Sequence, residues 1–213
     1  MPVPPPPSAV PPLPPNPWGD RRRLRVGLLG GSFNPAHDGH RHIALLALRR
    51  LGLDQVWLLV SPQNPLKSPA ETPPQPVRIA SARAIAGRHP GLRVSGVEAR
   101  LGTRYTADTL VALTRRFPRT RFVWLMGADN LAQIDRWARW GTIFRTVPVA
   151  IFARGPYSQR ALAAKAARRF APFRLAAGAA HALAATRPPA WVYLSIRRHP
   201  ASSTALRAAR GVS

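Results

Sequence analysis

The stretch GLLGGSFNPAHDGH (residues 27–40) decides the fold of this chain. A mainly apolar run over residues 24–29 leads into the paired glycines Gly30 and Gly31, and a helical pattern of apolar residues begins near residue 39. The pattern predicts a strand, a tight loop and a helix start, in that order. Paired glycines let backbone N–H groups approach an anion, and a helix N-terminus adds unpaired N–H groups with a partial positive charge. We therefore expect a phosphate site here.

Two histidines, His37 and His40, stand three residues apart at the end of this stretch. Imidazole donors at a phosphate site can follow negative charge as it moves between oxygens. The alternative is a surface loop with two incidental histidines. We expect His37 and His40 to be the catalytic residues of the protein.

Length and composition limit the class of protein. At 213 residues the chain is long enough to bury a core within one domain, and it has no cysteine, hence no disulfide, thiol nucleophile or Cys-based metal site. No apolar run approaches the roughly 20 residues that span a bilayer, and the N-terminus lacks a signal-peptide pattern. We expect a cytoplasmic protein with no membrane partner.

The formal net charge of +24 is strongly basic, and Lys67 and Lys165 are the only lysines among 32 basic residues. Such a charge is typical of nucleic-acid binding, but these arginines are dispersed, and the abundant Ala and Pro are typical of GC-rich coding. A basic field also attracts phosphorylated substrates. We do not expect nucleic acid as a partner, and a basic RNA-binding protein on the same fold remains the alternative from another class.

The rest of the chain alternates between strand and helix patterns. Residues 1–22 form a Pro-rich tail expected to be disordered, with an SH3-type ligand as the alternative, and residues 23–213 form the folded domain. The strands are expected at 24–29, 55–60, 92–97, 121–126, 147–152 and 191–196, with helices at 39–51 and 76–88 and a solvated helix at 158–170. The fold class is α/β, a Rossmann-like, doubly wound parallel sheet in a single domain.

Residues 30–40 resemble the G-G-[ST]-F-[DN]-P-x-H-x-G-H signature of the nucleotidyltransferase superfamily. Within it, the stretch is most similar to bacterial nicotinate-nucleotide adenylyltransferases. This resemblance implies transfer of the adenylyl group of ATP to nicotinate mononucleotide, which gives deamido-NAD and pyrophosphate, a step of NAD biosynthesis. A related adenylyltransferase that uses nicotinamide mononucleotide or phosphopantetheine is the nearer alternative.

Three later segments extend the resemblance. Residues 103–110 (TRYTADTL) resemble S-Y-T-x-D-T-L, with Arg104 where Ser is usual, and residues 127–131 (GADNL) resemble G-x-D-x-L. Residues 200–207 (PASSTALR) resemble I-S-[SA]-T-x-[IL]-R, with Ala201 where Ile is usual. The four motifs follow one another in the order of the family.

The resemblance also implies a set of site residues. Those assigned to ATP are Gly30, Gly31, Ser32, Asp129, Ser203, Thr204 and Arg207. Those assigned to the mononucleotide are Phe33, Lys67, Thr106, Trp137 and Ala138. In the family the threonine contacts the nicotinate, the tryptophan stacks on the pyridine ring, and the following backbone N–H holds the carboxylate.

Ordinary structural roles stand beside several of these assignments. Thr106 or Asp108 would cap the helix that follows, a role compatible with the nicotinate contact of Thr106, and we expect both. The alternatives are an N-cap for Asp129 and a solvated loop residue for Lys67. The i, i+3 spacing of Trp137 and Trp140 would suit two core residues on one helix face, and we assign Trp140 to packing.

Mg²⁺ is the expected cofactor, brought with ATP and held largely by phosphate oxygens and water. The chain offers only eight acidic residues and no carboxylate cluster, so no metal ligand of its own is expected. The expected partners are ATP and nicotinate mononucleotide. The sequence leaves open whether the protein forms a homo-oligomer.

Overall fold

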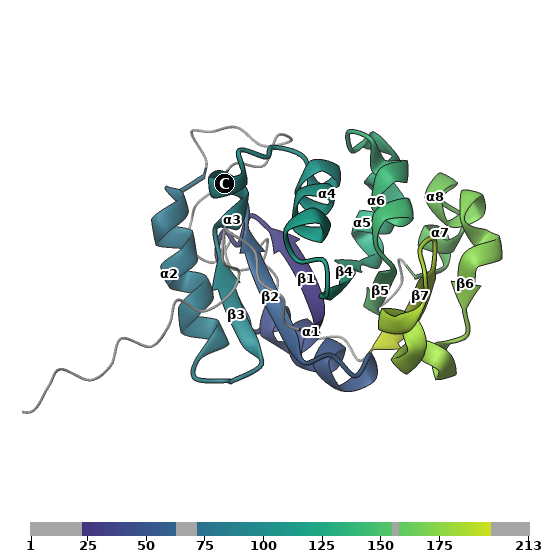
Figure 1. Cartoon of the computed structure of the whole chain (residues 1–213), viewed down its shortest axis with the longest axis horizontal. Helices are drawn as coiled ribbons and strands as arrows, with labels where there is room; N and C mark the ends of the chain where they lie inside the picture. Colours follow the sequence, from purple (N-terminus) through teal and green to yellow (C-terminus); the bar gives the residue numbers. More distant parts are fainter. Residues whose placement is uncertain (1–22, 63–71, 155–157, 197–213) are drawn as a thin grey trace, which may run out of the picture.

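A seven-stranded sheet, wholly parallel, forms the centre of the described part of the chain (residues 23–62, 72–154 and 158–196 of the computed structural model). Its order is β3-β2-β1-β4-β5-β7-β6, from left to right in Figure 1. The strands are β1 Arg25–Gly31, β2 Gln55–Val60, β3 Leu92–Ser95, β4 Arg121–Gly127, β5 Val149–Arg154, β6 Arg174–Leu175 and β7 Trp191–Ile196. The predicted α/β class and doubly wound parallel sheet are confirmed.

Helices cover both faces of this sheet. The α-helices are α1 Asp38–Arg50, α2 Gln75–Ala86, α3 Val97–Leu101, α4 Thr106–Arg116, α5 Ala128–Gln133, α6 Trp140–Thr146, α7 Ser158–Leu162 and α8 Lys165–Arg169. The 3₁₀ segments are η2 Ile134–Arg136, η3 Ala171–Phe173 and η4 Ala177–Ala185. Helices α1 and α2 pack with η4 on one face, and α3 to α8 pack on the other. Each face therefore has its own apolar core.

The sheet places the loop after β1 beside the loop after β4. Strand β1 pairs with β2 on one side and with β4 on the other, so the strand order reverses at β1. Ligands of open parallel sheets bind at such a switch point, beyond the carboxyl ends of the strands. The segment after Gly31 and the segment after Gly127 both lie at this edge.

Some elements differ from the sequence expectation. The expected strand at 92–97 ends at Ser95, because α3 begins at Val97. Strand β6 was not expected, since a two-residue edge strand carries no period-two pattern. The expected helix start near residue 39 and the end before Gly52 are confirmed by α1, and Gly52 adopts the left-handed φ of +58°.

The segment 158–170 is not the single solvated helix that was expected. It forms two short helices, α7 and α8, and Ala161, Ala166 and Phe170 are buried in the core. Alanines bury little area each, but their small size lets these helices approach α5 closely. Within the described residues, no helix combines the length and the apolar character that a membrane crossing would need.

Candidate functional site

The glycine loop leaves β1 beneath a tryptophan of the neighbouring strand. A Cβ atom at Gly30 would lie 2.3 Å from Cη2 of Trp124, whereas one at Gly31 would meet only the Phe33 ring, at 3.5 Å. Gly30 is therefore required by packing, a reason that the sequence analysis did not contain. Beyond it, the backbone N–H groups of Ser32 and Phe33 make no hydrogen bond to any described residue.

His37 and His40 come together at the start of α1. His37 is 7% exposed and precedes the helix, and its ring centroid lies 3.8 Å from that of His40. The His37 N–H donates to Nδ1 of His40 over 3.3 Å, and the His40 N–H donates back to the His37 carbonyl over 2.9 Å. Because Nδ1 accepts a hydrogen bond, the proton of the neutral His40 ring is on Nε2. His40 thus presents an Nε2–H donor.

Phe33 supports this pair from the side. Its φ is +49°, the left-handed region that few side chains occupy, and its ring is buried 4.8 Å from the His40 ring. The sequence assigned Phe33 to the mononucleotide. That assignment stays a prediction, and the ring contact shows in addition that Phe33 supports His40.

The second half of the site follows β4. Asp129 lies in the first turn of α5, exposed at the same edge as the glycine loop. Gly127 rather than Asp129 is the N-cap of α5. Similarly, Tyr105 is the N-cap of α4, so neither Thr106 nor Asp108 caps that helix. These capping alternatives are wrong, because each helix begins one or more residues earlier than the polar side chain would require.

An ion pair joins the two segments assigned to the pyridine nucleotide. Asp108, two residues after Thr106 in the first turn of α4, pairs with Arg139. Arg139 follows Trp137 and Ala138 and has a left-handed φ of +54°. The Arg139 guanidinium also lies over the Tyr105 ring, 5.9 Å from its centroid. The start of α4 and the turn before α6 are therefore held side by side.

Trp137 and Trp140 do not share a helix face. Trp137 ends η2 and is half-buried against the core, whereas Trp140 begins α6 after the left-handed turn at Arg139. The Ala138 N–H makes no hydrogen bond to the residues that the structure describes. It remains available for a carboxylate ligand.

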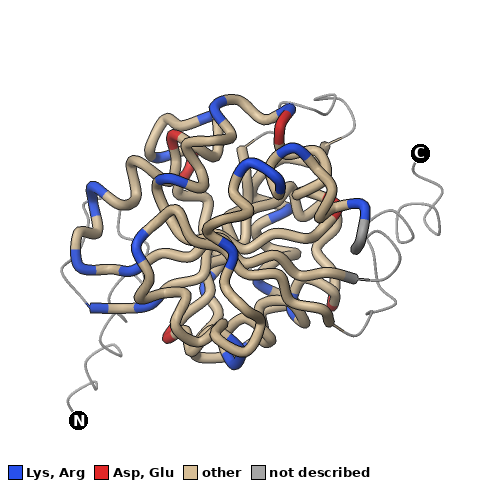
Figure 2. The backbone as a smooth tube through the Cα atoms, turned by 90° about the vertical axis from the view of Figure 1, so that its right-hand side faces the viewer, with Lys and Arg blue, Asp and Glu red and all other residues tan. Residues whose placement is uncertain are grey.

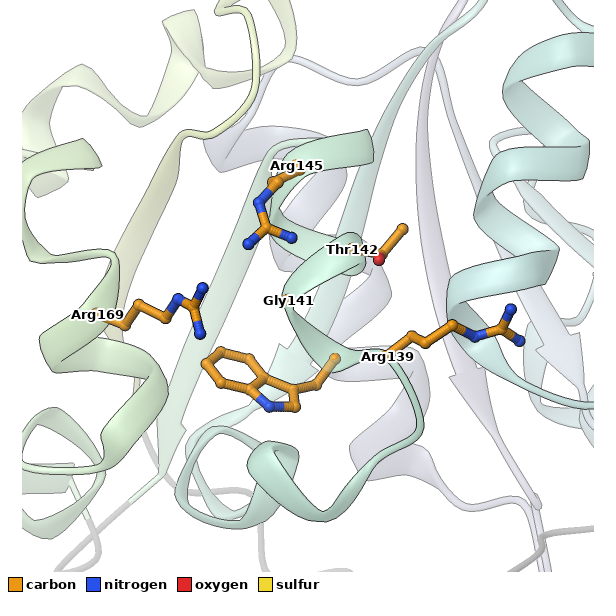
Figure 3. Close-up of a pocket in the computed structure, with 6 residues that line it drawn as sticks. Arg139, Gly141, Thr142, Arg145 and Arg169 are labelled. Atoms are coloured by element: carbon orange, nitrogen blue, oxygen red, sulfur yellow. The ribbon is translucent and has the colours of Figure 1, made fainter.

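Trp140 packs as expected, with its ring edge-on to Phe170 at 6.0 Å. It also lines a pocket of about 340 Å³, which Figure 3 shows with Arg145 and Arg169 on either side. The Arg169 guanidinium lies 5.5 Å from the centroid of the Trp140 ring. This pocket and a second one between α4 and α6 flank Arg139.

A buried carboxyl group lies beneath α4. Glu98 of α3 accepts a hydrogen bond from the Thr109 hydroxyl over 3.2 Å, and Thr109 in turn lies 2.8 Å from the Thr103 hydroxyl. Burial raises the pKa of Glu98 to about 7, although the Thr109 hydrogen bond opposes the shift. The sequence analysis did not single out Glu98, because one acid in an apolar segment carries no pattern.

The remaining predicted site residues lie outside the described residues. They are Lys67, Ser203, Thr204 and Arg207. Their assignments to phosphate groups stay predictions. In the described part of the chain, no three His, Cys, Asp or Glu side chains gather in a way that could hold a metal ion.

Known proteins resemble this chain over most of its length. The model of the cytidylyltransferase-like family matches residues 28–209. A "Probable nicotinate-nucleotide adenylyltransferase" of Cereibacter sphaeroides is 57% identical over 86% of this chain and 96% of the relative. Relatives with the same name from Parvibaculum lavamentivorans and Caulobacter sp. are 52% and 54% identical, over 89% and 86% of this chain and 94% and 97% of the relative.

The fold is shared with solved structures as well. Plasmodium falciparum nicotinic acid mononucleotide adenylyltransferase complexed with NaAD superposes with a TM-score of 0.66 at 15% identity, covering 87% of this chain and 83% of that chain. Its complex with APC gives a TM-score of 0.61 with the same identity and coverage. The chain belongs to the cytidylyltransferase-like family and, within it, to the nicotinate-nucleotide adenylyltransferases.

Proposed function

We propose that this protein transfers the adenylyl group of ATP to nicotinate mononucleotide, releasing pyrophosphate and forming deamido-NAD, in NAD biosynthesis. The identity of 57% to a relative of that name supports the reaction. The observation that carries it in the structure is the pairing of His37 with His40 beside two backbone N–H groups without described partners. In this proposal these groups donate to the phosphate chain of ATP.

The chemistry needs no nucleophile from the protein. A phosphate oxygen of the mononucleotide attacks the α-phosphorus of ATP, the new P–O bond forms, and the bond to the β-phosphate oxygen breaks. The enzyme must align the two phosphates and stabilise the charge that develops on the leaving pyrophosphate. His40, with its proton fixed on Nε2, and His37 donate to those oxygens.

The acceptor lies on the α4–α6 side of the site in this proposal. Trp137 stacks on the pyridine ring, the Ala138 N–H binds the carboxylate, and Thr106 contacts the nicotinate. The Asp108–Arg139 ion pair keeps these segments together. Asp129, exposed after β4, accepts hydrogen bonds from the adenosine.

The assignments outside the described residues complete the proposal. Lys67 meets the mononucleotide phosphate, and Ser203, Thr204 and Arg207 meet the β- and γ-phosphates.

Mg²⁺ would enter with ATP in this scheme. Among the described residues near the glycine loop, the carboxylates are Asp38 and Asp129, and both are exposed and isolated. Isolated carboxylates suit a hydrated ion that is held mainly by phosphate oxygens. When bound, the ion supplies further neutralisation of phosphate charge. The predicted cytoplasmic location and the oligomeric state stay untested predictions.

The RNA-binding alternative is not favoured by the distribution of the basic residues. On the face seen in Figure 2, Lys and Arg positions lie apart along several segments, with other residues between them. A nucleic-acid surface would gather them in one continuous stripe. Scatter of this kind is compatible with a general attraction for phosphorylated substrates.

The deciding experiment offers nicotinate mononucleotide, nicotinamide mononucleotide and phosphopantetheine separately to the enzyme with Mg-ATP and measures pyrophosphate release. A strong preference for the first supports the proposal. Activity with only one of the other acceptors would leave the fold assignment intact but would contradict the assignment of the acceptor residues. No activity with any of the three acceptors would favour the RNA-binding alternative. His40→Ala, prepared in parallel, excludes a contaminating activity.

A further inference from the structure

A buried arginine lies beneath the glycine loop. Arg78, in the first turns of α2, is only 2% exposed, and it forms no ion pair with any carboxylate that the structure describes. A buried charge is costly unless hydrogen bonds replace its water. Desolvation accordingly lowers the pKa of Arg78. Such a residue needs a structural reason at its position.

Four backbone carbonyls accept hydrogen bonds from the guanidinium in place of water. Nε donates to the Pro73 carbonyl over 2.8 Å, and Nη2 donates to the Pro62 carbonyl over 2.7 Å. Nη1 donates to the carbonyls of Ser32 and Ser61, each over 2.8 Å. One side chain thus joins the loop after β1, the end of β2 and the residues just before α2.

This arrangement fixes the direction of the peptide units in the glycine loop. The Gly31 carbonyl accepts from the N–H and the hydroxyl of Ser61, at 3.1 and 3.3 Å, and the Ser32 carbonyl accepts from Arg78. In a trans peptide the N–H points opposite to the carbonyl. The Ser32 N–H is therefore directed away from Ser61, and the Phe33 N–H is directed away from Arg78, which itself binds the Ser61 carbonyl. Successive N–H groups turned to one side form a concave anion site.

The same side chain holds the residues just after β2. Ser61 and Pro62 begin the segment that continues to Lys67, which lies outside the described residues, and Pro73 follows its end. Gln75, one turn before Arg78, reinforces the contact by donating to the Val60 carbonyl over 2.7 Å. The first turns of α2 therefore hold the β2 end of the site.

We propose that Arg78 is a positioning residue that orients the glycine loop and the residues just after β2 for phosphate binding, by holding the carbonyls of Ser32, Ser61 and Pro62. It touches neither substrate. The proposal rests on the proposed function, because it takes the glycine loop to bind substrate phosphate. Loss of Arg78 lets the peptide units at Ser32, Ser61 and Pro62 turn, so the enzyme loses affinity for ATP and for the mononucleotide together.

The test compares Arg78→Met and Arg78→Lys with Arg83→Met, a variant of an exposed arginine on the same helix. We expect Arg78→Met to raise both KM values and to lower kcat/KM by about 100-fold, as misplacement of about 1 Å does. Arg78→Lys, with three donors, restores part of the loss, and Arg83→Met behaves as the wild type. In Arg78→Ala, added guanidinium restores activity and added KCl does not.

A purely structural role gives a different result. Unchanged KM values in Arg78→Met, with only a lower melting temperature, would overturn the proposal. Calorimetric titration with Mg-ATP alone separates this outcome from failure of the proposed function. If the wild type binds Mg-ATP but transfers nothing, the assigned reaction fails, and weaker Mg-ATP binding by Arg78→Met still supports the role of Arg78.

Discussion

Two arginines hold the two halves of the candidate site, and they do so in opposite ways. Arg78 is buried and donates to four backbone carbonyls, whereas the Arg139 side chain is 58% exposed and pairs with Asp108, which is 35% exposed. Hydrogen bonds shielded from water keep their strength in salt, but an exposed ion pair is screened and contributes little. We therefore expect the glycine-loop half to be the more rigid one and the α4–α6 half to adjust more easily to its ligand.

The largest expected effect belongs to the preorganised half. His40→Ala should lower kcat by about 100- to 1,000-fold, as loss of one donor to a developing oxyanion does. The fold should persist, because His40 lies at a loop–helix junction. Steady-state kinetics and a circular-dichroism melt measure both.

His89→Ala is the matched control for that variant. The His89 Nδ1 also accepts a backbone N–H, from Gly91 over 3.1 Å, but His89 precedes β3 at the opposite edge of the sheet. It should keep wild-type turnover. Wild-type turnover in His40→Ala would remove the mechanism proposed here.

The second prediction concerns the rigidity of the same half. Gly30→Ala places a methyl group against Trp124 and should destabilise the protein by about 1–3 kcal/mol, the usual cost of overpacking. Gly31→Ala meets only ordinary contact with Phe33 and should cost less. Urea denaturation of the two variants tests this. Equal losses would mean that the loop is less closely packed than the contacts indicate.

The third prediction concerns a part of the α4–α6 half that is not exposed, the Glu98 carboxyl group buried beneath α4. Its pKa of about 7 lies above the ordinary value of 4.5, so the native state holds the proton more tightly and the free energy of unfolding falls as pH rises from 4.5 to 7. Glu98→Gln should therefore be more stable than the wild type at pH 8, by about 1–3 kcal/mol.

Denaturation at pH 5 provides the control for Glu98→Gln, because the wild-type carboxyl group is then largely protonated. The two proteins should have similar stability there. A stability difference that is the same at pH 5 and pH 8 would contradict the raised pKa of Glu98.

The fourth prediction separates the two substrates. Trp137→Ala should raise KM for nicotinate mononucleotide about tenfold, since stacking of a base on an aromatic ring contributes about 1–3 kcal/mol. KM for ATP should change little, in contrast to Arg78→Met. Steady-state kinetics with each substrate varied in turn measure both KM values. Equal changes in the two KM values would mean that Trp137 is a packing residue of the core and not a contact of the mononucleotide.

The smallest effect is expected at the exposed ion pair. Asp108→Asn should cost about 0.2–1 kcal/mol in binding of the mononucleotide, and the difference should vanish at high salt. Asp54→Asn is the control, because Asp54 pairs with Arg25 over 2.9 Å with similar exposure at the other edge of the sheet. It should leave KM unchanged. If the loss of affinity in Asp108→Asn did not depend on salt, the ion pair of Arg139 would not be screened. The contrast with the buried Arg78 would then be wrong.

Much of the fold could be predicted because it depends on residues that are close together along the chain. The paired glycines after β1 and the start of α1 at Asp38 follow from turn and helix rules. Continuous apolar strands such as Gln55–Val60 indicate a parallel sheet covered on both faces. The edge at which the motifs gather then follows from the rules of parallel sheets.

The errors arose where tertiary packing overrides a local pattern. The alanines of α7 and α8 look like a solvated surface in sequence, yet the helices bury them against α5. Trp137 and Trp140 have helical spacing, yet the left-handed turn at Arg139 separates them. Spacing predicts a shared face only if the helix continues.

The sequence by itself determined the sheet, the glycine loop, the two histidines and the family of the chain, because each of these depends on residues close together along the chain. Only the tertiary structure decided why Gly30 must be a glycine, how Arg78 is satisfied and what raises the pKa of Glu98. Each of those depends on other elements: Trp124 on β4 beside Gly30, the carbonyls of two loops around Arg78, and the packing that buries the Glu98 carboxyl group. Contacts between distant segments are the part of this protein that no local pattern carries.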